Sequence, residues 1–208
     1  MQQENTQNPE NIIILATNNL GKVKELEESL AQHTHCSYIA QSEFAVPEVE
    51  ETGLTFVENA LIKARNACSH SGLPSLADDS GLIVPALNDQ PGIYSARYAG
   101  NARSFDDNIN KLLNELDHTA EEDRYAYFVC NIVYLRSAED PIPLIFQGMW
   151  EGRITNEPKG DKGFGYDPVF FVPEHNCTAA ELDLNIKNQI SHRAQAIDSF
   201  KNFLQEDF

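Results

Sequence analysis

A short apolar run that ends in polar turn residues and leads into an amphipathic helix most constrains the fold of this chain. Residues 12–16 are apolar and rich in β-branched side chains, which is typical of a buried strand. Residues 22–32 follow with Val23, Leu26 and Leu30 on one stripe and acidic residues opposite, which predicts a helix. Because strand and helix patterns alternate further along the chain, the sequence favours an α/β fold.

The later segments extend this alternation and add one long hairpin. Thr55 precedes Glu58 by three residues, a capping-box pattern that predicts a helix over residues 55–69. Residues 125–135 form a long β-rich run, and residues 143–152 are expected to return as its hairpin partner. Further strands are expected at residues 38–41, 75–77, 82–86 and 169–172, and further helices at residues 104–116 and 191–204. Alternating units with one hairpin predict a mixed sheet with flanking helices.

The net charge limits the partners of the 208-residue chain. Its 15 Lys+Arg and 32 Asp+Glu give a charge of −17 at pH 7. Proteins that bind nucleic acid or anionic membranes normally carry a stripe or patch of basic residues. Because this chain is strongly acidic, we expect neither partner. No Gly/Ser-rich linker divides the chain. We therefore expect one domain over residues 12–208, preceded by a disordered polar extension over residues 1–11.

The cysteines and the N-terminal residues favour a cytoplasmic protein. Cys36, Cys68, Cys130 and Cys177 are scattered without a C-x-x-C pair, which is typical of reduced, mostly buried thiols. The first eleven residues lack Lys, Arg and an apolar core, so they do not resemble a secretory signal. The longest early apolar run has five residues, whereas a membrane-spanning helix needs about 20. The six histidines do not supply the clustered ligands of a zinc site.

A loop between the first strand and the first helix is a candidate phosphate-binding site. It runs from Thr17 to Lys22. Backbone N–H groups at a helix start favour an anion, and Lys22 adds a point charge. It is not a Walker A loop, because Ala16 and Val23 stand where that motif needs Gly and Ser or Thr. A capped turn with a surface lysine is the alternative.

Carboxylates in two further loops are candidate metal ligands. Glu50 and Glu51 precede a helix whose apolar stripe is interrupted by Lys63; dipole compensation and a snorkelling lysine are the alternatives. Asp78 and Asp79 begin a D-D-S-G segment that is expected to form a turn between two short strands. Because adjacent extended residues point to opposite faces, at most one of these two aspartates should face a given site. Such a carboxylate suits Mg²⁺, which takes one or two protein oxygens.

A glycine-rich aromatic segment at residues 163–168 is a candidate base-binding site. Its glycines permit close backbone approach, and its rings offer a flat face for a purine; an aromatic hairpin is the alternative. Lys187, His192 and Arg193 follow it in the sequence. The last two open a helix, where cations are unfavourable against the dipole, which favours a ligand there. Ser191 as an N-cap would explain the helix start by itself.

Six motifs in this order resemble those of the inosine triphosphate pyrophosphatase family, over about residues 12–204: T-N-N-x-G-K, E-E-T-G-x-T-F-x-E-N-A-x-x-K-A, A-D-D-S-G-L, P-G-I-Y-S-A-R-Y-A-G, G-F-G-Y-D-P-x-F and K…S-H-R. The branch that it resembles most is the bacterial one that hydrolyses dITP and XTP. Asn18 is a mild variant of a position that often carries Gly.

The resemblance implies a fold and an activity. The fold would be a long curved mixed sheet with flanking helices, with two lobes around a central substrate cleft. The activity would be Mg²⁺-dependent cleavage of dITP, ITP and XTP to the monophosphate and pyrophosphate, which cleanses the nucleotide pool. The protein would act as a homodimer.

The resemblance also implies residue roles. Asp79 would accept a proton and, with Glu51, hold Mg²⁺. The substrate would be bound by Thr17, Asn18, Asn19, Leu20, Gly21, Lys22, Lys63, Ser80, Phe164, Gly165, Tyr166, Asp167, Lys187, His192 and Arg193.

Three other functions compete with this one. One is a pyrophosphatase that prefers another modified base, such as a damaged pyrimidine. A protein that senses ITP without cleaving it would be expected to lack a carboxylate equivalent to Asp79, so Asp79 counts against it. An acidic protein that binds other proteins and no small ligand would not explain the cations in the four loops, which are Lys22, Lys63, Lys187 and Arg193.

Overall fold

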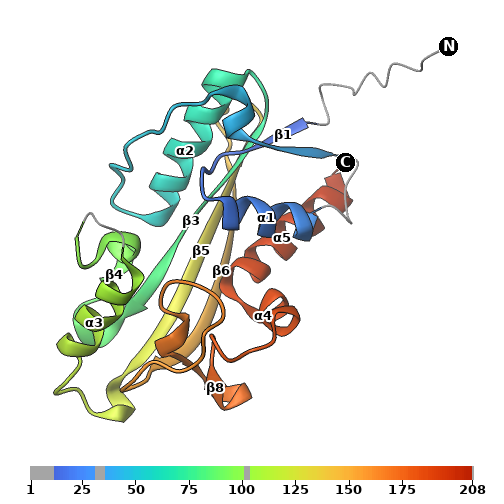
Figure 1. The fold of residues 1–208 in the computed structure, drawn as a ribbon. Helices are drawn as coiled ribbons and strands as arrows, with labels where there is room; N and C mark the ends of the chain where they lie inside the picture. Colours follow the sequence, from blue (N-terminus) through green and yellow to red (C-terminus); the bar gives the residue numbers. More distant parts are fainter. Residues whose placement is uncertain (1–11, 31–35, 101–103, 208) are drawn as a thin grey trace. The chain divides into compact units, whose positions relative to one another are not determined.

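The computed structural model describes residues 12–30, 36–100 and 104–207. The expected disordered extension over residues 1–11 and the expected helix end at Gln32 lie outside the described residues. The helices are α1 (Leu20–Leu30), α2 (Phe56–Ser71), α3 (Phe105–Glu115), α4 (Leu184–Ile190) and α5 (His192–Asp207), shown in Figure 1. The strands are β1 (Ile12–Leu15), β2 (Ser37–Ala40), β3 (Ser75–Val84), β4 (Gln90–Pro91), β5 (Tyr125–Leu135), β6 (Leu144–Ile154), β7 (Phe170–Val172) and β8 (Cys177–Thr178).

The strands of the described residues form one eight-stranded mixed sheet. Its order is β2-β1-β3-β5-β6-β7-β8, and β4 pairs with β3. Strand β1 is parallel to β2 and to β3, whereas β7 is antiparallel to both β6 and β8. The predicted α/β class with a mixed sheet and flanking helices is therefore confirmed. In the part of the chain that the structure describes, no helix combines the length and the apolar character needed to cross a membrane.

The chain divides into two compact units. Unit 1 holds residues 1–79, 131–146 and 197–208, and unit 2 holds residues 80–130 and 147–196. Strands β3, β5 and β6 and helix α5 have residues in both units. This division does not test the expected single domain over residues 12–208, and both that domain and the expected substrate cleft remain predictions.

Unit 1 has a core in which a helix of small residues packs on the sheet. Ala60, Ala64 and Ala67 of α2 recur at helical spacing and are fully buried against Ile14 of β1 and Ala77 of β3. The start of α2 has the predicted capping box. Thr55 Oγ1 accepts a hydrogen bond from Glu58 N (3.2 Å), and Glu58 Oε2 accepts one from Leu54 N (2.7 Å). In Figure 1, α2 lies along this part of the sheet.

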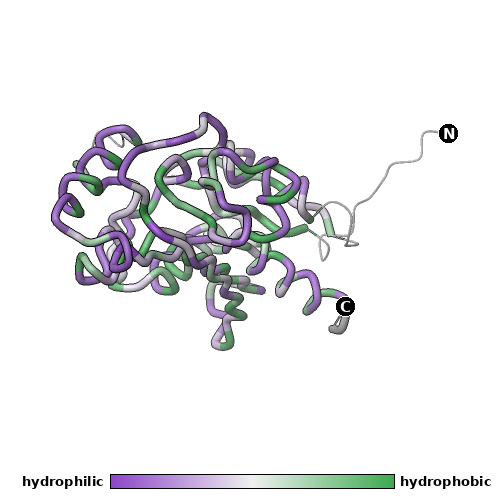
Figure 2. Tube along the Cα trace, turned by 90° about the horizontal axis from the view of Figure 1, so that it is seen from below, coloured by the Kyte–Doolittle hydropathy of each residue, from purple (hydrophilic) through white to green (hydrophobic). Residues whose placement is uncertain are grey.

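Unit 2 has an aromatic core. Ile109 and Leu112 of α3 are buried with Phe128 of β5, Trp150 of β6 and Phe170 of β7. The rings of Phe128 and Phe170 lie 4.6 Å apart between centroids. Hydrophilic residues dominate the outer loops in Figure 2, and hydrophobic residues concentrate on the inner segments.

The D-D-S-G segment corrects one sequence prediction. It was expected to form a turn between two strands, but Asp78 to Gly81 lie inside the continuous strand β3. Asp and Gly are poor strand formers, so the sequence indicated a turn. The tertiary environment overrides this preference, because β3 lies next to β5 in the sheet and lysines pair with both aspartates.

Candidate active site

Asn19 organises the loop between β1 and α1. Its Oδ1 accepts hydrogen bonds from Gly21 N (2.9 Å) and Lys22 N (3.2 Å), as an N-cap does. Thr17 Oγ1 accepts one from Asn19 N (3.2 Å), and Leu20 begins α1. Two of the N–H groups expected to bind an anion are therefore bonded to Asn19, and Lys22 is the charged group that the loop offers.

Asn18 is held by two residues that the sequence did not single out. Its Oδ1 accepts a hydrogen bond from Gln41 Nε2 (2.8 Å), and its Nδ2 donates to Glu48 Oε1 (3.4 Å). Gln41 is buried and lies 23 positions from Asn18. No pattern in the sequence signals a contact at that separation.

Five charged side chains form a lysine–carboxylate cluster in unit 1: Lys22, Lys63, Glu51, Asp78 and Asp79. Lys22 Nζ lies 2.8 Å from Asp78 Oδ2, and Lys63 Nζ lies 2.9 Å from Glu51 Oε1 and 3.4 Å from Asp79 Oδ1. The two adjacent aspartates therefore pair with lysines of different helices, Asp78 with Lys22 of α1 and Asp79 with Lys63 of α2.

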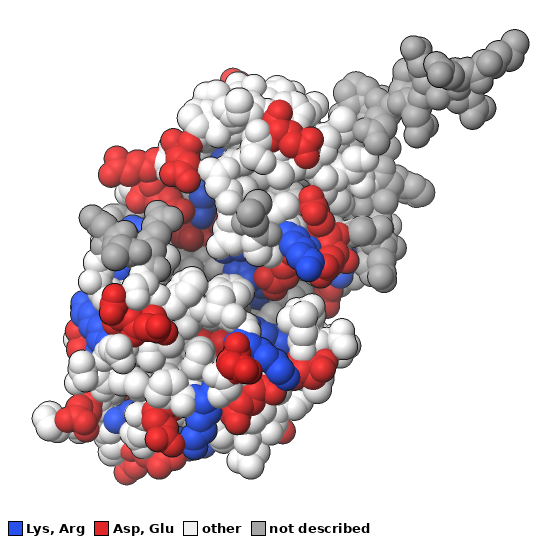
Figure 3. All heavy atoms as spheres, in the orientation of Figure 1, with Lys and Arg blue, Asp and Glu red and all other residues white. Residues whose placement is uncertain are grey.

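Burial and pairing shift the pKa values of this cluster. Burial raises the pKa of the Asp79 carboxyl, and the charges of Lys63 and Lys22 offset that effect only in part. Burial also works to lower the pKa of the Lys63 ammonium, but Asp79, Asp78 and Glu51 outweigh it and hold that pKa above its ordinary value. Across the face shown in Figure 3, basic side chains likewise lie beside acidic ones.

The oxygen donors of the cluster fit a hard divalent metal ion. Glu51 and Asp79 present hard carboxylate oxygens from separate segments, and both lie within 3.4 Å of the one cation Lys63 Nζ. The described residues contain no group of three or more His, Cys, Asp or Glu side chains placed to hold a metal. Two carboxylates are typical of Mg²⁺ coordination, in which one or two protein carboxylates bind the ion and water and substrate phosphate complete its coordination shell.

A second cluster, the aromatic–cation cluster, lies in unit 2. Phe164, Asp167, Lys187 and Arg193 are in contact there, and His192, which precedes Arg193 at the start of α5, is counted with them. The buried Asp167 holds two of its members, because its Oδ2 accepts hydrogen bonds from Phe164 N (2.8 Å) and from Lys187 Nζ. Gly163 has a φ of 77°, and a Cβ there would lie 2.1 Å from Asp167 Oδ2. The glycine is therefore needed for this close approach.

Phe164 is the exposed ring of this cluster. Lys187 Nζ lies 5.2 Å and Arg193 Cζ 5.7 Å from its ring centroid. Tyr166, by contrast, is buried and donates a hydrogen bond from its hydroxyl to Ser95 O (2.9 Å). Phe164 is therefore the ring of this segment that is open to solvent, whereas Tyr166 anchors the loop, in which Gly165 has a φ of 63°.

His192 and Arg193 are fixed at the start of α5. Ser191 Oγ accepts a hydrogen bond from Ala194 N (3.2 Å), the predicted N-cap. The His192 ring stacks on Phe128, with centroids 4.8 Å apart and planes 13° apart. Arg193 is 2% exposed, and its Nη2 donates to Ser80 Oγ (3.1 Å). The aromatic–cation cluster therefore contacts the residue that follows Asp79 in β3.

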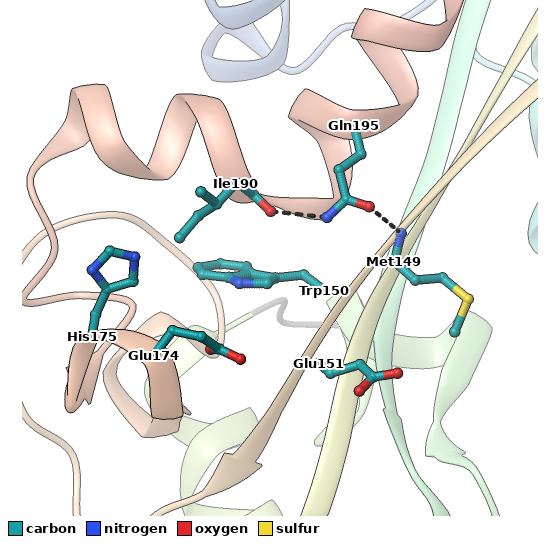
Figure 4. A pocket seen from close by; sticks show the side chains of 7 residues that line it. All are labelled: Met149, Trp150, Glu151, Glu174, His175, Ile190 and Gln195. Carbon is teal, nitrogen blue, oxygen red and sulfur yellow. Dashed lines mark hydrogen bonds between the residues drawn. The ribbon is translucent and has the colours of Figure 1, made fainter.

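Two residues of unit 2 that the sequence did not single out support the 191–193 turn. Gly148 of β6 allows close packing, since a Cβ there would lie 2.0 Å from His192 O. Gln195 donates from Nε2 to Ile190 O (2.9 Å) and accepts from Met149 N (3.3 Å), as Figure 4 shows. A pocket of about 260 Å³ adjoins these residues and is lined by Met149, Trp150, Glu151, Glu174, His175, Ile190 and Gln195. None of the predicted site residues lines it.

The mixed sheet and the charge-dense cluster on β3 define an α/β protein with paired lysines and carboxylates suited to a phosphate-bearing ligand. The sequence model of the Ham1 family matches residues 13–203. The chain belongs to the Ham1 family.

Named relatives and solved structures agree with this assignment. The chain is 54% identical to a dITP/XTP pyrophosphatase of Idiomarina loihiensis, over 90% of this chain and 95% of the relative. It is 56% identical to a dITP/XTP pyrophosphatase of Thioalkalivibrio sulfidiphilus, over 89% and 94%. The structure of a HAM1 protein from Coxiella burnetii is similar, with a TM-score of 0.89, 50% identity and coverage of 94% of this chain and 98% of that chain.

Proposed function

We propose that this protein is a Mg²⁺-dependent nucleoside triphosphate pyrophosphohydrolase that cleaves dITP, ITP and XTP to the monophosphate and pyrophosphate. The observation that carries the proposal is the shared Lys63 ammonium, which lies 2.9 Å from Glu51 and 3.4 Å from Asp79. The relatives named dITP/XTP pyrophosphatase match nearly the whole chain and support the substrate class. Such an activity would keep deaminated purines out of DNA and RNA.

The lysines would bind the triphosphate. The scissile bond lies between anionic phosphates, which repel an attacking water until cations offset their charge. Lys22 and Lys63 each carry three N–H donors, so each can keep a carboxylate partner and still bond a phosphate oxygen. Thr17, Asn18 and Asn19 would shape the phosphate loop, and Leu20 and Gly21 would place its backbone at the start of α1.

Asp79 would act on the water. Its carboxylate, on β3 beside Lys63, would accept the proton of the attacking water, and a positioned base contributes about 10²–10⁴-fold to a rate. Glu51 and Asp79 would hold Mg²⁺, which polarises phosphate oxygens and makes a bound water more acidic. Ser80 would contact the substrate from the next position of β3, held by Arg193.

The aromatic–cation cluster would select the base. A purine would stack on Phe164, while His192 and Arg193 would donate hydrogen bonds to the oxygen at C6 of hypoxanthine or xanthine. Adenine carries an amino group there and would leave these donors facing another donor. A buried site of this kind discriminates by about 10⁴ or more. Gly165, Tyr166, Asp167 and Lys187 would position Phe164 and the sugar.

The proposal also covers the oligomeric state of the protein and its location in the cell. We expect it to act as a homodimer in the cytoplasm, as the family resemblance implied. Sedimentation equilibrium of the purified chain tests the dimer.

The products formed from ITP and Mg²⁺ test the activity. Pyrophosphate and IMP are expected, with a kcat/KM for ITP far above that for ATP. Orthophosphate would mean cleavage between the β- and γ-phosphates and would contradict the mechanism. A higher kcat/KM for a damaged pyrimidine triphosphate would favour the alternative pyrophosphatase, and ITP binding without any product would favour a sensor.

A further inference from the structure

Phe105 is a half-exposed aromatic residue that the proposed mechanism does not use. Phe105 is 46% exposed. Its ring contacts the ring of Phe164, which is 48% exposed. The two centroids lie 6.5 Å apart with planes at 47°. Together the rings form a continuous apolar surface in water, and covering such a surface is favourable.

The position of Phe105 is set by a well-anchored helix start. Ser104 Oγ caps α3 by accepting a hydrogen bond from Asp107 N (3.2 Å). The buried Asn108 ties the same turn to the preceding segment, because its Oδ1 accepts from Ala99 N (2.6 Å) and its Nδ2 donates to Ser95 O (3.3 Å). Phe105 is therefore held in place before any ligand binds, which reduces the entropy lost on binding.

Phe105 adds an aromatic neighbour to a Phe164 ring that otherwise has two cations near it. Lys187 and Arg193 bring positive charge to within 6 Å of the Phe164 centroid, and Phe105 is its aromatic neighbour. A base stacked on Phe164 that extended toward Phe105 would gain a second aromatic contact. A base covering only Phe164 would not.

We propose that Phe105 contacts the base and helps the enzyme to select purines over pyrimidines. This inference rests on the proposed function, in which Phe164 stacks the base. A purine has two fused rings and reaches beyond the Phe164 face to Phe105, whereas the single ring of a pyrimidine covers Phe164 alone. An aromatic contact of this kind is worth about two- to tenfold in affinity.

The Phe105→Ala variant tests the proposal. We expect its KM for ITP to rise about two- to tenfold with kcat nearly unchanged, and its kcat/KM for UTP to stay as in the wild type. Phe105→Tyr, which keeps the ring, should restore the KM for ITP. Tyr94→Ala is the matched control, because Tyr94 is also exposed and contacts a cation, Arg97, at 5.2 Å; its KM for ITP should not change.

An unchanged KM for ITP, or equal losses for ITP and UTP, would overturn the role of Phe105. If Phe105→Ala does not fold, Phe105→Leu removes the ring with a smaller loss of apolar volume and carries the same expectations. If the wild type releases no pyrophosphate, the proposed function fails by itself. Calorimetric binding of IMP and UMP then decides about Phe105, since only IMP binding should weaken in Phe105→Ala.

Discussion

The two clusters place their functional side chains by different means. In the lysine–carboxylate cluster, opposite charges from β3, α1, α2 and the segment before α2 pair at 2.8–3.4 Å and offset one another. In the aromatic–cation cluster, close packing sets the positions: Gly163 lets the loop approach Asp167, and Gly148 lets β6 approach His192. The first cluster should therefore respond most to a change of charge, and the second to a change of volume.

The largest effect is expected from Asp79→Asn, which changes charge but not shape. Loss of the carboxylate that accepts the proton should lower kcat for ITP by about 10²–10⁴-fold. The variant should still fold, because asparagine has nearly the same shape as aspartate and Lys63 keeps Glu51 as its partner. Pyrophosphate release and thermal unfolding measure the two quantities. Asp198→Asn is the control, since Asp198 is an exposed carboxylate paired with Lys201; a near wild-type rate for Asp79→Asn would remove Asp79 from the mechanism.

The next effect is expected from Gly148→Ala, which changes volume but not charge. The added Cβ would meet backbone atoms of His192 and Ala196 at 2.0 and 2.8 Å, so the free energy of unfolding should fall by about 1–3 kcal/mol. The displaced 191–193 turn should also lower the preference for ITP over ATP. Gly152→Ala is the matched control: it meets Phe171 O at 2.5 Å and should destabilise without changing that preference. The same preference for ITP over ATP in Gly148→Ala and Gly152→Ala would contradict the role of Gly148.

Local patterns allowed the sequence to predict much of both regions. The β5 run, the Thr55 capping box and the Ser191 N-cap depend on neighbouring residues, and the structure confirms all three. The α/β class with a mixed sheet was predicted from the alternation of strand and helix patterns, and the family from the order of the motifs; both are confirmed.

Contacts between distant segments could not be predicted from the sequence. Gln195 bonds Met149 at a separation of 46 positions, and Gln41 bonds Asn18 at 23. The turn predicted at Asp78 was wrong for the same reason, because the lysines that stabilise charges inside β3 come from other elements. Helix α4, of seven residues, was not predicted, although Asp183 caps its start by accepting a hydrogen bond from Asn185 N (2.9 Å).

A smaller effect is expected from His192→Ala and Arg193→Ala, each of which removes one donor to the base. The ratio of kcat/KM for ITP to that for ATP should fall at least several-fold, because adenine would no longer face that donor. Arg153→Ala is the control, since Arg153 lies over Phe171, outside the aromatic–cation cluster. If the ITP/ATP ratio stays unchanged in both variants, the base-reading role is wrong.

The smallest effect is expected from Asp140→Asn, a charge change in unit 1 outside the lysine–carboxylate cluster. Arg136 bonds both Asp140 oxygens, at 2.6 and 2.8 Å, and these bonds, with those from Ile142 N and Arg136 N, hold the pKa of Asp140 well below its ordinary value. A lowered pKa stabilises the fold above the unfolded pKa of about 3.9, and this contribution is lost as the pH falls through the folded pKa.

Asp140→Asn should therefore lower the Tm at pH 7, by about 2–4 °C for each kcal/mol lost, and the difference from the wild type should shrink below about pH 4. Thermal unfolding at pH 7 and pH 3 measures both effects. The ITP hydrolysis rate should stay unchanged at a temperature where the variant is folded, because this ion pair joins two residues of one hairpin turn. A loss of activity like that of Asp79→Asn would show that charge pairing throughout unit 1, rather than at β3 alone, sets the rate.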